Sequence, residues 1–169
     1  MLTNHSESAV MGKTVKTIEI SADDAVFWLD ANGNWHNSDG KFRHKKIIDY
    51  FHASIRRDDK GYHLYQAHED YIEKVYFHHE DTALFVFDVL LQTDIMLVLN
   101  TQRKVKLSPR KLSITNDSLY MHRGHEIIKF AEQGLMKIAP FLEEDGDQLF
   151  IRSKNRRYRI PTRVEKENI

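Results

Sequence analysis

The chain has 169 residues, of which 41% are hydrophobic and 30% charged, enough for a packed core in one domain or two small units and not typical of a disordered chain. Lysine plus arginine equals aspartate plus glutamate at 25 each, so no overall charge favours nucleic acid or an anionic membrane. The absence of cysteine excludes disulfides, thiolate metal sites and cysteine nucleophiles, and it fits a reducing, cytoplasmic location.

The N-terminal segment predicts a flexible tail, a strand and then a hairpin. Residues 1–13 are polar and contain no apolar signal core, so we expect them to form the tail. The alternation over 14–20 predicts a strand. Apolar and aromatic residues over 26–30 and 34–37 flank Asn32-Gly33, a dipeptide that tolerates the positive φ angles of a tight hairpin turn.

The segment 42–57 changes to a helical period. Its apolar face carries Ile47, Ile48, Phe51 and Ile55, and the Asp58–Gly61 turn is predicted to end the helix. The opposite face is polar and places His44 and His52 two helical turns apart in solvent. The pattern therefore predicts an amphipathic helix that covers one face of a sheet.

Strands are predicted for the middle of the chain, over 62–66, 71–79, 82–91, 95–100 and 104–107. The most apolar stretch, 82–99, contains Asp88 and Asp94. It is therefore not an uninterrupted apolar segment of the roughly 18 residues that a membrane-spanning helix needs, and we predict no membrane segment.

The second half repeats the order of elements of the first. Strands are predicted for 111–115, 119–122, 148–152 and 157–160, with a helix over 125–142 between the second and third. The apolar positions that begin at Ile127 follow the same helical spacing as those that begin at Ile47. We therefore predict an α+β fold of two related units, 14–93 and 94–162, followed by a tail over 163–169. Each unit is a mainly antiparallel sheet with one amphipathic helix, and the pair is the product of an internal duplication.

No motif of a catalytic or metal site is present. The ten histidines include no His-Glu-x-x-His spacing, and the chain contains neither Gly-x-Ser-x-Gly nor a glycine-rich phosphate loop. We therefore predict no metal and no cofactor, and we favour a protein that is not an enzyme. A small hydrolase or metal-assisted enzyme that uses histidines and carboxylates is the alternative.

The densest basic cluster lies near the C-terminus. Arg156, Arg157 and Arg159, with Tyr158 between them, form a hairpin strand that is able to contact the phosphates of a nucleic acid. The other interpretation is a solvated hairpin whose arginines face the acidic residues of 143–147 or the acidic surface of the first unit. The neutral chain favours this second interpretation, so nucleic acid is disfavoured as a partner.

The predicted strand 71–79 carries the sharpest polar cluster. Alternation places Glu73 on the same face as Val75 and Phe77, so its carboxylate needs a cation or a wet sheet margin. Lys74, Arg56 and Arg57 are candidate partners. We favour a structural ion pair over a ligand contact.

Several short motifs resemble the bacterial family known as domain of unknown function 1285. They are Gly33–Trp35, Ile55–Tyr62, Glu73–Val75 and Glu80-Asp81, within a resemblance that covers about 28–107. The arginine-containing stretch that the family carries near its C-terminal helix has no match in 125–142. The resemblance implies a two-part α+β fold with repeated motifs, homo-oligomers and a link to signalling or regulation, and it supplies no established activity.

These observations lead us to expect a cytoplasmic, non-enzymatic module with a regulatory role. Two small units form a cleft that suits a peptide or a small molecule. The residues expected to contact that ligand are Glu73, Lys74, Asp81, Trp35 and Arg56.

Overall fold

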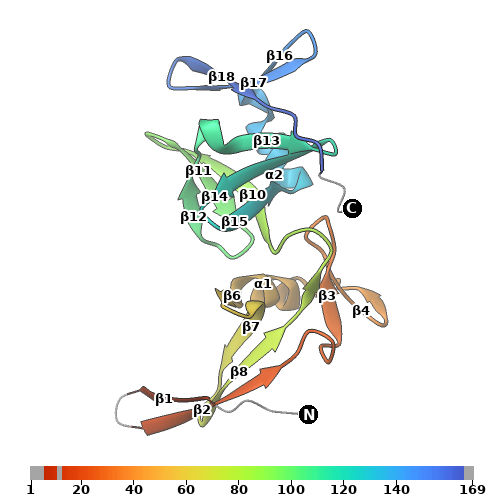
Figure 1. The fold of residues 1–169 in the computed structure, drawn as a ribbon, viewed down its shortest axis with the longest axis vertical. Helices are drawn as coiled ribbons and strands as arrows, with labels where there is room; N and C mark the ends of the chain where they lie inside the picture. Colours follow the sequence, from red (N-terminus) through yellow and green to blue (C-terminus); the bar gives the residue numbers. More distant parts are fainter. Residues whose placement is uncertain (1–5, 11–12, 166–169) are drawn as a thin grey trace. The chain divides into compact units, whose positions relative to one another are not determined.

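The structure is a computed structural model that describes residues 6–10 and 13–165, with side chains from Val15 onwards. The chain divides into two compact units, residues 1–83 and 84–169 (Figure 1). The boundary that the sequence suggested, at residue 93, lies in the second unit. Residues 6–10, predicted to belong to a flexible tail, form a strand, and residues 1–5, 11–12 and 166–169 lie outside the described part of the chain.

The first unit contains two sheets. The larger has the order β1-β2-β8-β7-β6 and the smaller the order β5-β4-β3-β9. Their strands are β1 (Ser6–Val10), β2 (Lys13–Ile20), β3 (Phe27–Leu29), β4 (Trp35–Asn37), β5 (Gly40–Lys41), β6 (Ile55–Asp58), β7 (Gly61–Ala67), β8 (Tyr71–Tyr76) and β9 (His78–His79). The pairs β2–β8 and β3–β9 are parallel and the others antiparallel. The predicted hairpin is confirmed, because Gly33 takes a positive φ of 82° between β3 and β4.

Helix α1 (Lys45–Ala53) is shorter than the predicted helix over 42–57. The helix ends where the Ser54 hydroxyl donates a hydrogen bond to the Tyr50 carbonyl oxygen, at 2.6 Å. The prediction that the helix continues to Arg57 is wrong, because the next residues form β6. That strand pairs antiparallel with β7 through a tight turn that Gly61 closes with a φ of 116°.

An aromatic cluster fixes α1 on the small sheet. The Phe51 ring contacts the rings of Phe27, Trp35 and Phe42 edge to face, with centroids 5.0 to 5.4 Å apart. The prediction that His52 faces solvent is wrong, since it is only 2% exposed, whereas Ile47 on the predicted apolar face is 46% exposed. The helix is therefore rotated from the orientation that apolar residues alone suggest, because the imidazole packs against Trp35.

The second unit contains a six-stranded and a three-stranded sheet, in the orders β12-β11-β10-β15-β14-β13 and β16-β17-β18. The strands are β10 (Leu84–Leu91), β11 (Ile95–Leu99), β12 (Lys104–Lys106), β13 (Leu112–Thr115), β14 (Ser118–Arg123), β15 (Glu126–Phe130), β16 (Leu142–Asp145), β17 (Gln148–Ser153) and β18 (Arg156–Ile160). Helix α2 (Glu132–Ile138) and the 3₁₀ helices η1 (Pro109–Lys111) and η2 (Ala139–Phe141) complete the unit. The β10–β15 pair is parallel, and the other pairs are antiparallel.

The predicted helix over 125–142 is wrong for its first part. Gly124 turns the chain back with a φ of 58°, and Ile127 and Ile128 then alternate along β15, one exposed and one buried. Pro140, which is not compatible with a helix interior, lies in η2, after α2 has ended. The match in helical spacing between the two halves therefore fails, because Ile127 and Ile128 are not helical.

Helix α2 packs closely on the six-stranded sheet. A Cβ atom at Gly134 would lie 2.2 Å from the Val86 carbonyl oxygen, so only glycine allows this approach. The prediction of a mixed, mainly antiparallel α+β fold is confirmed, with one α-helix in the described residues of each unit. Within residues 6–10 and 13–165, no helix has the length and apolar character needed to span a bilayer.

Candidate anion-binding site

Lys74 belongs to a hydrogen-bonded cluster around Asp58 of β6. The Lys74 ammonium lies 3.0 Å from Asp58 Oδ2, and the Tyr76 hydroxyl donates to the same oxygen at 2.7 Å. Burial acts to raise the pKa of Asp58, but the hydrogen bonds from Tyr76 and Lys74 outweigh it and lower the pKa to about 2. Burial and the neighbouring carboxylate raise the pKa of Tyr76. Both groups therefore keep one protonation state near neutral pH, which favours a structural role.

Glu73 lies on the opposite face of β8, with Val75. Among the described residues, Glu73 forms no ion pair, so the predicted pairing with Lys74, Arg56 or Arg57 is not found. Arg56 instead donates hydrogen bonds from Nη1 to the carbonyl oxygens of Ala53 and Ile55, each at 2.9 Å. Arg56 therefore closes the C-terminal end of α1.

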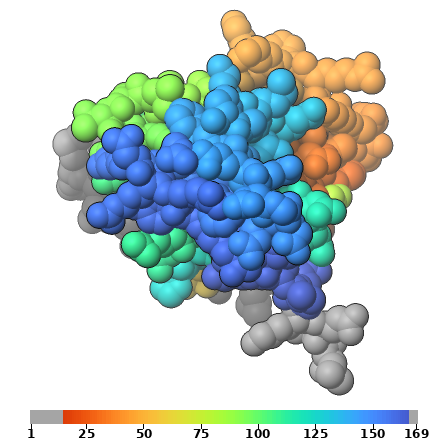
Figure 2. Space-filling view, turned by 90° about the horizontal axis from the view of Figure 1, so that it is seen from above, coloured from red at the N-terminus to blue at the C-terminus, as the bar shows by residue number. Residues whose placement is uncertain are grey.

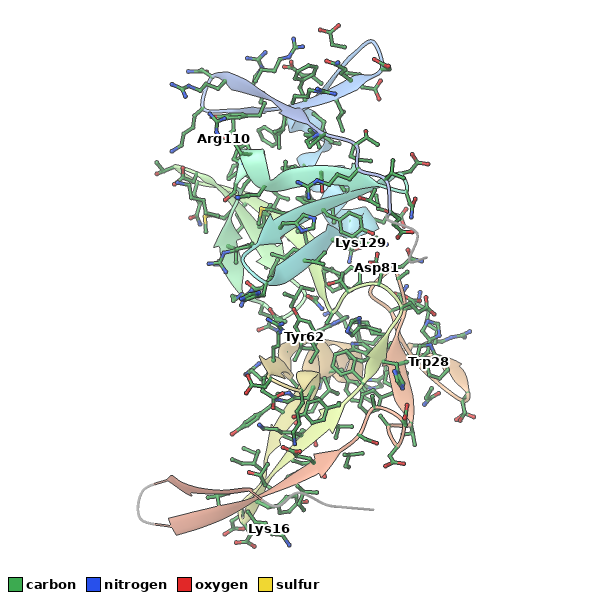
Figure 3. All side chains as sticks on the ribbon, viewed as in Figure 1. Lys16, Trp28, Tyr62, Asp81, Arg110 and Lys129 are labelled. Carbon is green, nitrogen blue, oxygen red and sulfur yellow. The ribbon has the colours of Figure 1, made fainter. Side chains whose placement is uncertain are left out.

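Trp35 is a core residue and Asp81 lies in a loop, and neither belongs to β8. Trp35 is 1% exposed, and its Nε1 donates a hydrogen bond to His52 Nδ1 at 3.2 Å, so it belongs to the core of the first unit. Asp81 lies in the loop between β9 and β10 (Figure 3). The preceding residue, Glu80, accepts a hydrogen bond from the Ala31 backbone N–H at 3.0 Å. The structure therefore does not gather the five predicted ligand contacts into one site.

The three C-terminal arginines, in contrast, line one groove with a volume of about 650 Å³. The residues around it are Arg110, Arg156, Arg157, Tyr158, Arg159 and Pro161. The sheet β16–β18 that supplies most of them is turned to the viewer in Figure 2, in blue. The sequence therefore identified three of the four arginines.

Arg110 is the arginine that the sequence did not indicate. It belongs to η1, which precedes β13, and Figure 3 shows it beside β18. Its guanidinium carbon lies 5.3 Å from the centre of the Tyr158 ring. The basic pair Arg110-Lys111 was the one available signal, and nothing in the sequence linked it to a strand that begins at Arg156.

The backbone beyond β18 fixes one end of the groove. The backbone N–H of Ile114 in β13 donates to the Pro161 carbonyl oxygen at 2.9 Å, and the backbone N–H of Arg163 donates to the Ile114 carbonyl oxygen at 2.7 Å. Residues 161–163 therefore follow the outer edge of β13, while β18 itself runs beside η1.

Acidic residues offset only part of this positive charge. Arg152 pairs with Glu143 at 2.6 Å and Arg157 with Asp145 at 2.8 Å, so a hairpin facing the acidic 143–147 turn is the correct interpretation for these two arginines. The Arg157 guanidinium also lies 3.7 Å from the centre of the Phe150 ring. Arg110, Arg156 and Arg159 form no ion pair with any residue in the described part of the chain. The groove therefore has excess positive charge.

No group of three or more histidine or carboxylate side chains capable of holding a metal ion occurs within the described ranges. What the described residues bring together is a basic groove beside an edge strand of the second unit.

These features define a two-unit α+β protein with an arginine-lined strand edge. A DUF1285 family protein from Silicibacter pomeroyi DSS-3 has a similar structure, with a TM-score of 0.55 and 10% identity over 86% of this chain and 82% of that one. A DUF1285 family protein from Shewanella baltica OS155 gives a TM-score of 0.47 and 17% identity over 68% of this chain and 91% of its own. No family model and no curated protein matches the sequence. The resemblance predicted from the sequence is thus confirmed at the level of the fold, which this chain shares with the first of these proteins.

Proposed function

We propose that this protein is a non-enzymatic binding module that holds a ligand with anionic groups in the groove along β18. The observation that carries the proposal is the convergence of Arg110, Arg156 and Arg159 on one groove without a carboxylate partner in the described residues. A guanidinium group matches the geometry of carboxylates and phosphates with two parallel hydrogen bonds. Such a groove therefore suits a ligand with more than one anionic group.

The dimensions of the groove support a ligand rather than a single ion. Its volume of about 650 Å³ lies within the range of roughly 300–1,000 Å³ that is typical of small-molecule sites. Because the four arginines are all exposed, salt screens their attraction for an anion. We therefore expect affinity to fall as ionic strength rises.

A hydrolase would need a histidine and a carboxylate that act on a substrate. His36 Nε2 and Asp30 Oδ2 lie 2.6 Å apart, which is the geometry of such a pair. The imidazole stacks on Trp28, however, and Asp30 accepts hydrogen bonds from the backbone N–H groups of Asn32 and Asn34. These contacts support a role in holding the β3–β4 turn, so we favour the binding module over the enzyme.

The regulatory role, the homo-oligomer and the cytoplasmic location stay predictions. The internal duplication also stays a proposal, now supported by the order of elements alone. Three strands, an α-helix and three strands follow one another in β3-β4-β5-α1-β6-β7-β8 and again in β13-β14-β15-α2-β16-β17-β18, where the 3₁₀ helix η2 stands between α2 and β16. Superposition of residues 26–66 on residues 111–152 tests the duplication. One feature counts against it: a parallel partner strand pairs with the first strand of one run, as β9 does with β3, but with the third strand of the other, as β10 does with β15.

Calorimetric titration of the full chain with inorganic tripolyphosphate tests the proposed function. We expect binding at low salt that weakens at least about tenfold in the double variant Arg156→Gln/Arg159→Gln, because two charge-assisted contacts are lost. The matched control is Arg103→Gln/Arg123→Gln, which removes the same charge from two arginines that pair with Glu126 on β15. Equal losses in both double variants, or no binding by the unaltered protein, would overturn the proposal.

A further inference from the structure

We infer that the first unit contains a second binding site, a small apolar cavity at the start of α1 that takes a carboxylate carried on a short alkyl chain. The inference goes beyond the proposed function, because it concerns the other unit and a ligand with an apolar part. The cavity has a volume of about 230 Å³, and the residues around it are Asn37, Phe42, Arg43, His44 and Ile47.

The apolar walls of the cavity come from the segment after β5 and from the first turn of α1. The ring of Phe42 packs edge to face on Phe51, with 5.2 Å between the centroids, and its backbone N–H donates to the Trp35 carbonyl oxygen at 2.8 Å. Ile47 adds an aliphatic side chain from α1 that is 46% exposed. One wall is therefore held in place before a ligand binds, and Ile47 leaves apolar surface for a ligand to cover.

Positive charge surrounds this apolar cavity. Residues 37–50 contain four lysine or arginine side chains and two aspartates, so positive charge is in excess. Arg43, which lines the cavity, forms no ion pair within the part of the chain that the structure describes, and neither do Lys41 and Lys46. Helix α1 begins at His44 without a side-chain cap and with no acidic residue in its first turn, so its positive end adds to this charge. Charge complementarity therefore favours an anion.

The apolar cavity and the cations together select an amphiphilic anion. Small-molecule sites combine apolar walls with a few polar groups that orient the ligand, and a guanidinium group such as that of Arg43 pairs well with a carboxylate. A water molecule occupies about 30 Å³ of liquid and a methylene group is of similar size, so the cavity holds about six to eight carbons. Tripolyphosphate has no apolar part and is not expected to prefer this cavity to the groove along β18.

Titration of the full chain with octanoate, followed by ¹H–¹⁵N NMR, tests the inference. We expect the largest shift changes at the backbone amides of residues 42–47. The amides of Val26, Leu91 and Met136 serve as internal controls and should not shift, because their side chains are all more exposed than that of Ile47 and report non-specific apolar binding.

Two further ligands separate the chain from the charge. Butyrate has the same charge on a chain four carbons shorter, and each buried methylene contributes about fourfold in affinity. We therefore expect butyrate to bind at least about tenfold more weakly than octanoate. Octyltrimethylammonium has the chain with the opposite charge, and we expect it also to bind at least about tenfold more weakly.

Three variants separate the parts of the site. Arg43→Gln removes a cation without a partner and Ile47→Gln replaces a half-exposed wall residue, so we expect both variants to fold and to bind octanoate about three- to tenfold more weakly. Lys45→Gln is the matched control, because it removes the same charge from a neighbour that pairs with Asp49 and does not line the cavity. It should bind octanoate as the unaltered protein does.

Several results would overturn the inference. These are equal binding of butyrate and octanoate, equal losses in the three variants, or shift changes centred on Val26, Leu91 or Met136. Self-association that Ile47→Gln abolishes, or binding of anionic vesicles without binding of octanoate, would assign the cavity to a second copy of the chain or to a lipid surface instead. Arg156→Gln/Arg159→Gln should bind octanoate as the unaltered protein does, so this site and the proposed function are tested separately.

Discussion

The guanidinium group of Arg110 lies over the ring of Tyr158, with 5.3 Å between the guanidinium carbon and the ring centre. This contact joins η1 to β18 and places a fourth arginine in a groove whose other arginines follow one another along a single strand. A cation–π contact at an exposed site contributes about 0.5–1 kcal/mol, so it orients Arg110 more than it stabilises the unit.

Replacing Arg110 should therefore weaken ligand binding more than folding. We expect Arg110→Ala to lower the affinity for tripolyphosphate about three- to tenfold and the free energy of unfolding by at most about 1 kcal/mol. Arg110→Lys keeps the charge without the planar group, and we expect an intermediate affinity. Titration calorimetry and urea unfolding measure the two effects. Unchanged affinity in Arg110→Ala would show that Arg110 does not contact the ligand.

In the proposed binding mode, Asp145 competes with the ligand for Arg157, so replacing Asp145 should strengthen binding. We expect Asp145→Asn to raise the affinity for tripolyphosphate about two- to fivefold, while the exposed pair contributes no more than about 0.5 kcal/mol to stability. Asp147→Asn makes the same change of charge in the same turn and serves as the control. An equal gain in both variants would mean that overall charge, and not release of Arg157, determines affinity.

The ion pair of Lys74 should contribute to stability, and the carboxylate of Glu73 should not. Lys74 and Asp58 are 24% and 27% exposed, so Lys74→Met leaves a partly buried carboxylate without its cation. We expect it to lower the free energy of unfolding by about 1–3 kcal/mol, against no more than about 0.5 kcal/mol for Glu73→Gln. Urea unfolding of the two variants decides this. Equal costs would mean that Glu73 has a stabilising partner.

Protonation of His52 should destabilise the protein in mild acid. Burial lowers the pKa of His52 from 6.5 to about 4, so the unfolded chain binds this proton at a higher pH than the folded protein does. The stability that the neutral imidazole contributes is complete above pH 6.5 and is lost as the pH falls towards 4, by at most about 3 kcal/mol.

The slope of stability against pH measures this effect. Between pH 7 and pH 4.5, His52→Gln should show a smaller slope than the unaltered protein, with a remainder from His63 and His122, whose pKa values burial also lowers. His125→Gln, at an exposed position, should keep the full slope. A slope that His52→Gln leaves unchanged would contradict the assignment.

Local patterns predicted most of the strands and the hairpin turn, because each is determined by neighbouring residues, but they missed β1, β6, β15 and β16. Asn32-Gly33 forms the expected hairpin turn, and the predicted strands over 148–152 and 157–160 correspond to β17 and β18. Helices were less predictable. Ile127 and Ile128 suit a strand as well as a helix, and only the turn at Gly124 and the presence of Pro140 separate β15 from α2.

The candidate site was predictable only in part, because it depends on contacts between distant segments. Sequence identified Arg156, Arg157 and Arg159, but it could not distinguish the arginine that Asp145 neutralises from the two that remain available. Nor could it bring Arg110 to Tyr158, since no local pattern sets the distance between η1 and β18. The pairing of Lys74 with Asp58 likewise follows from the order of β6, β7 and β8 in the sheet.

The location of bound anion is the most direct test of the central claim. Two-dimensional ¹H–¹⁵N NMR of the full chain, titrated with tripolyphosphate, reports every backbone amide and the arginine side-chain N–H groups. The basic groove predicts the largest shift changes at residues 110–111 and 156–160, since Pro109 and Pro161 have no backbone N–H. A second basic run, Lys41, Arg43, Lys45 and Lys46, provides an internal control because it carries similar charge on the first unit. Changes centred on residues 41–46, or spread evenly over all basic residues, would contradict a specific anion-binding groove at β18.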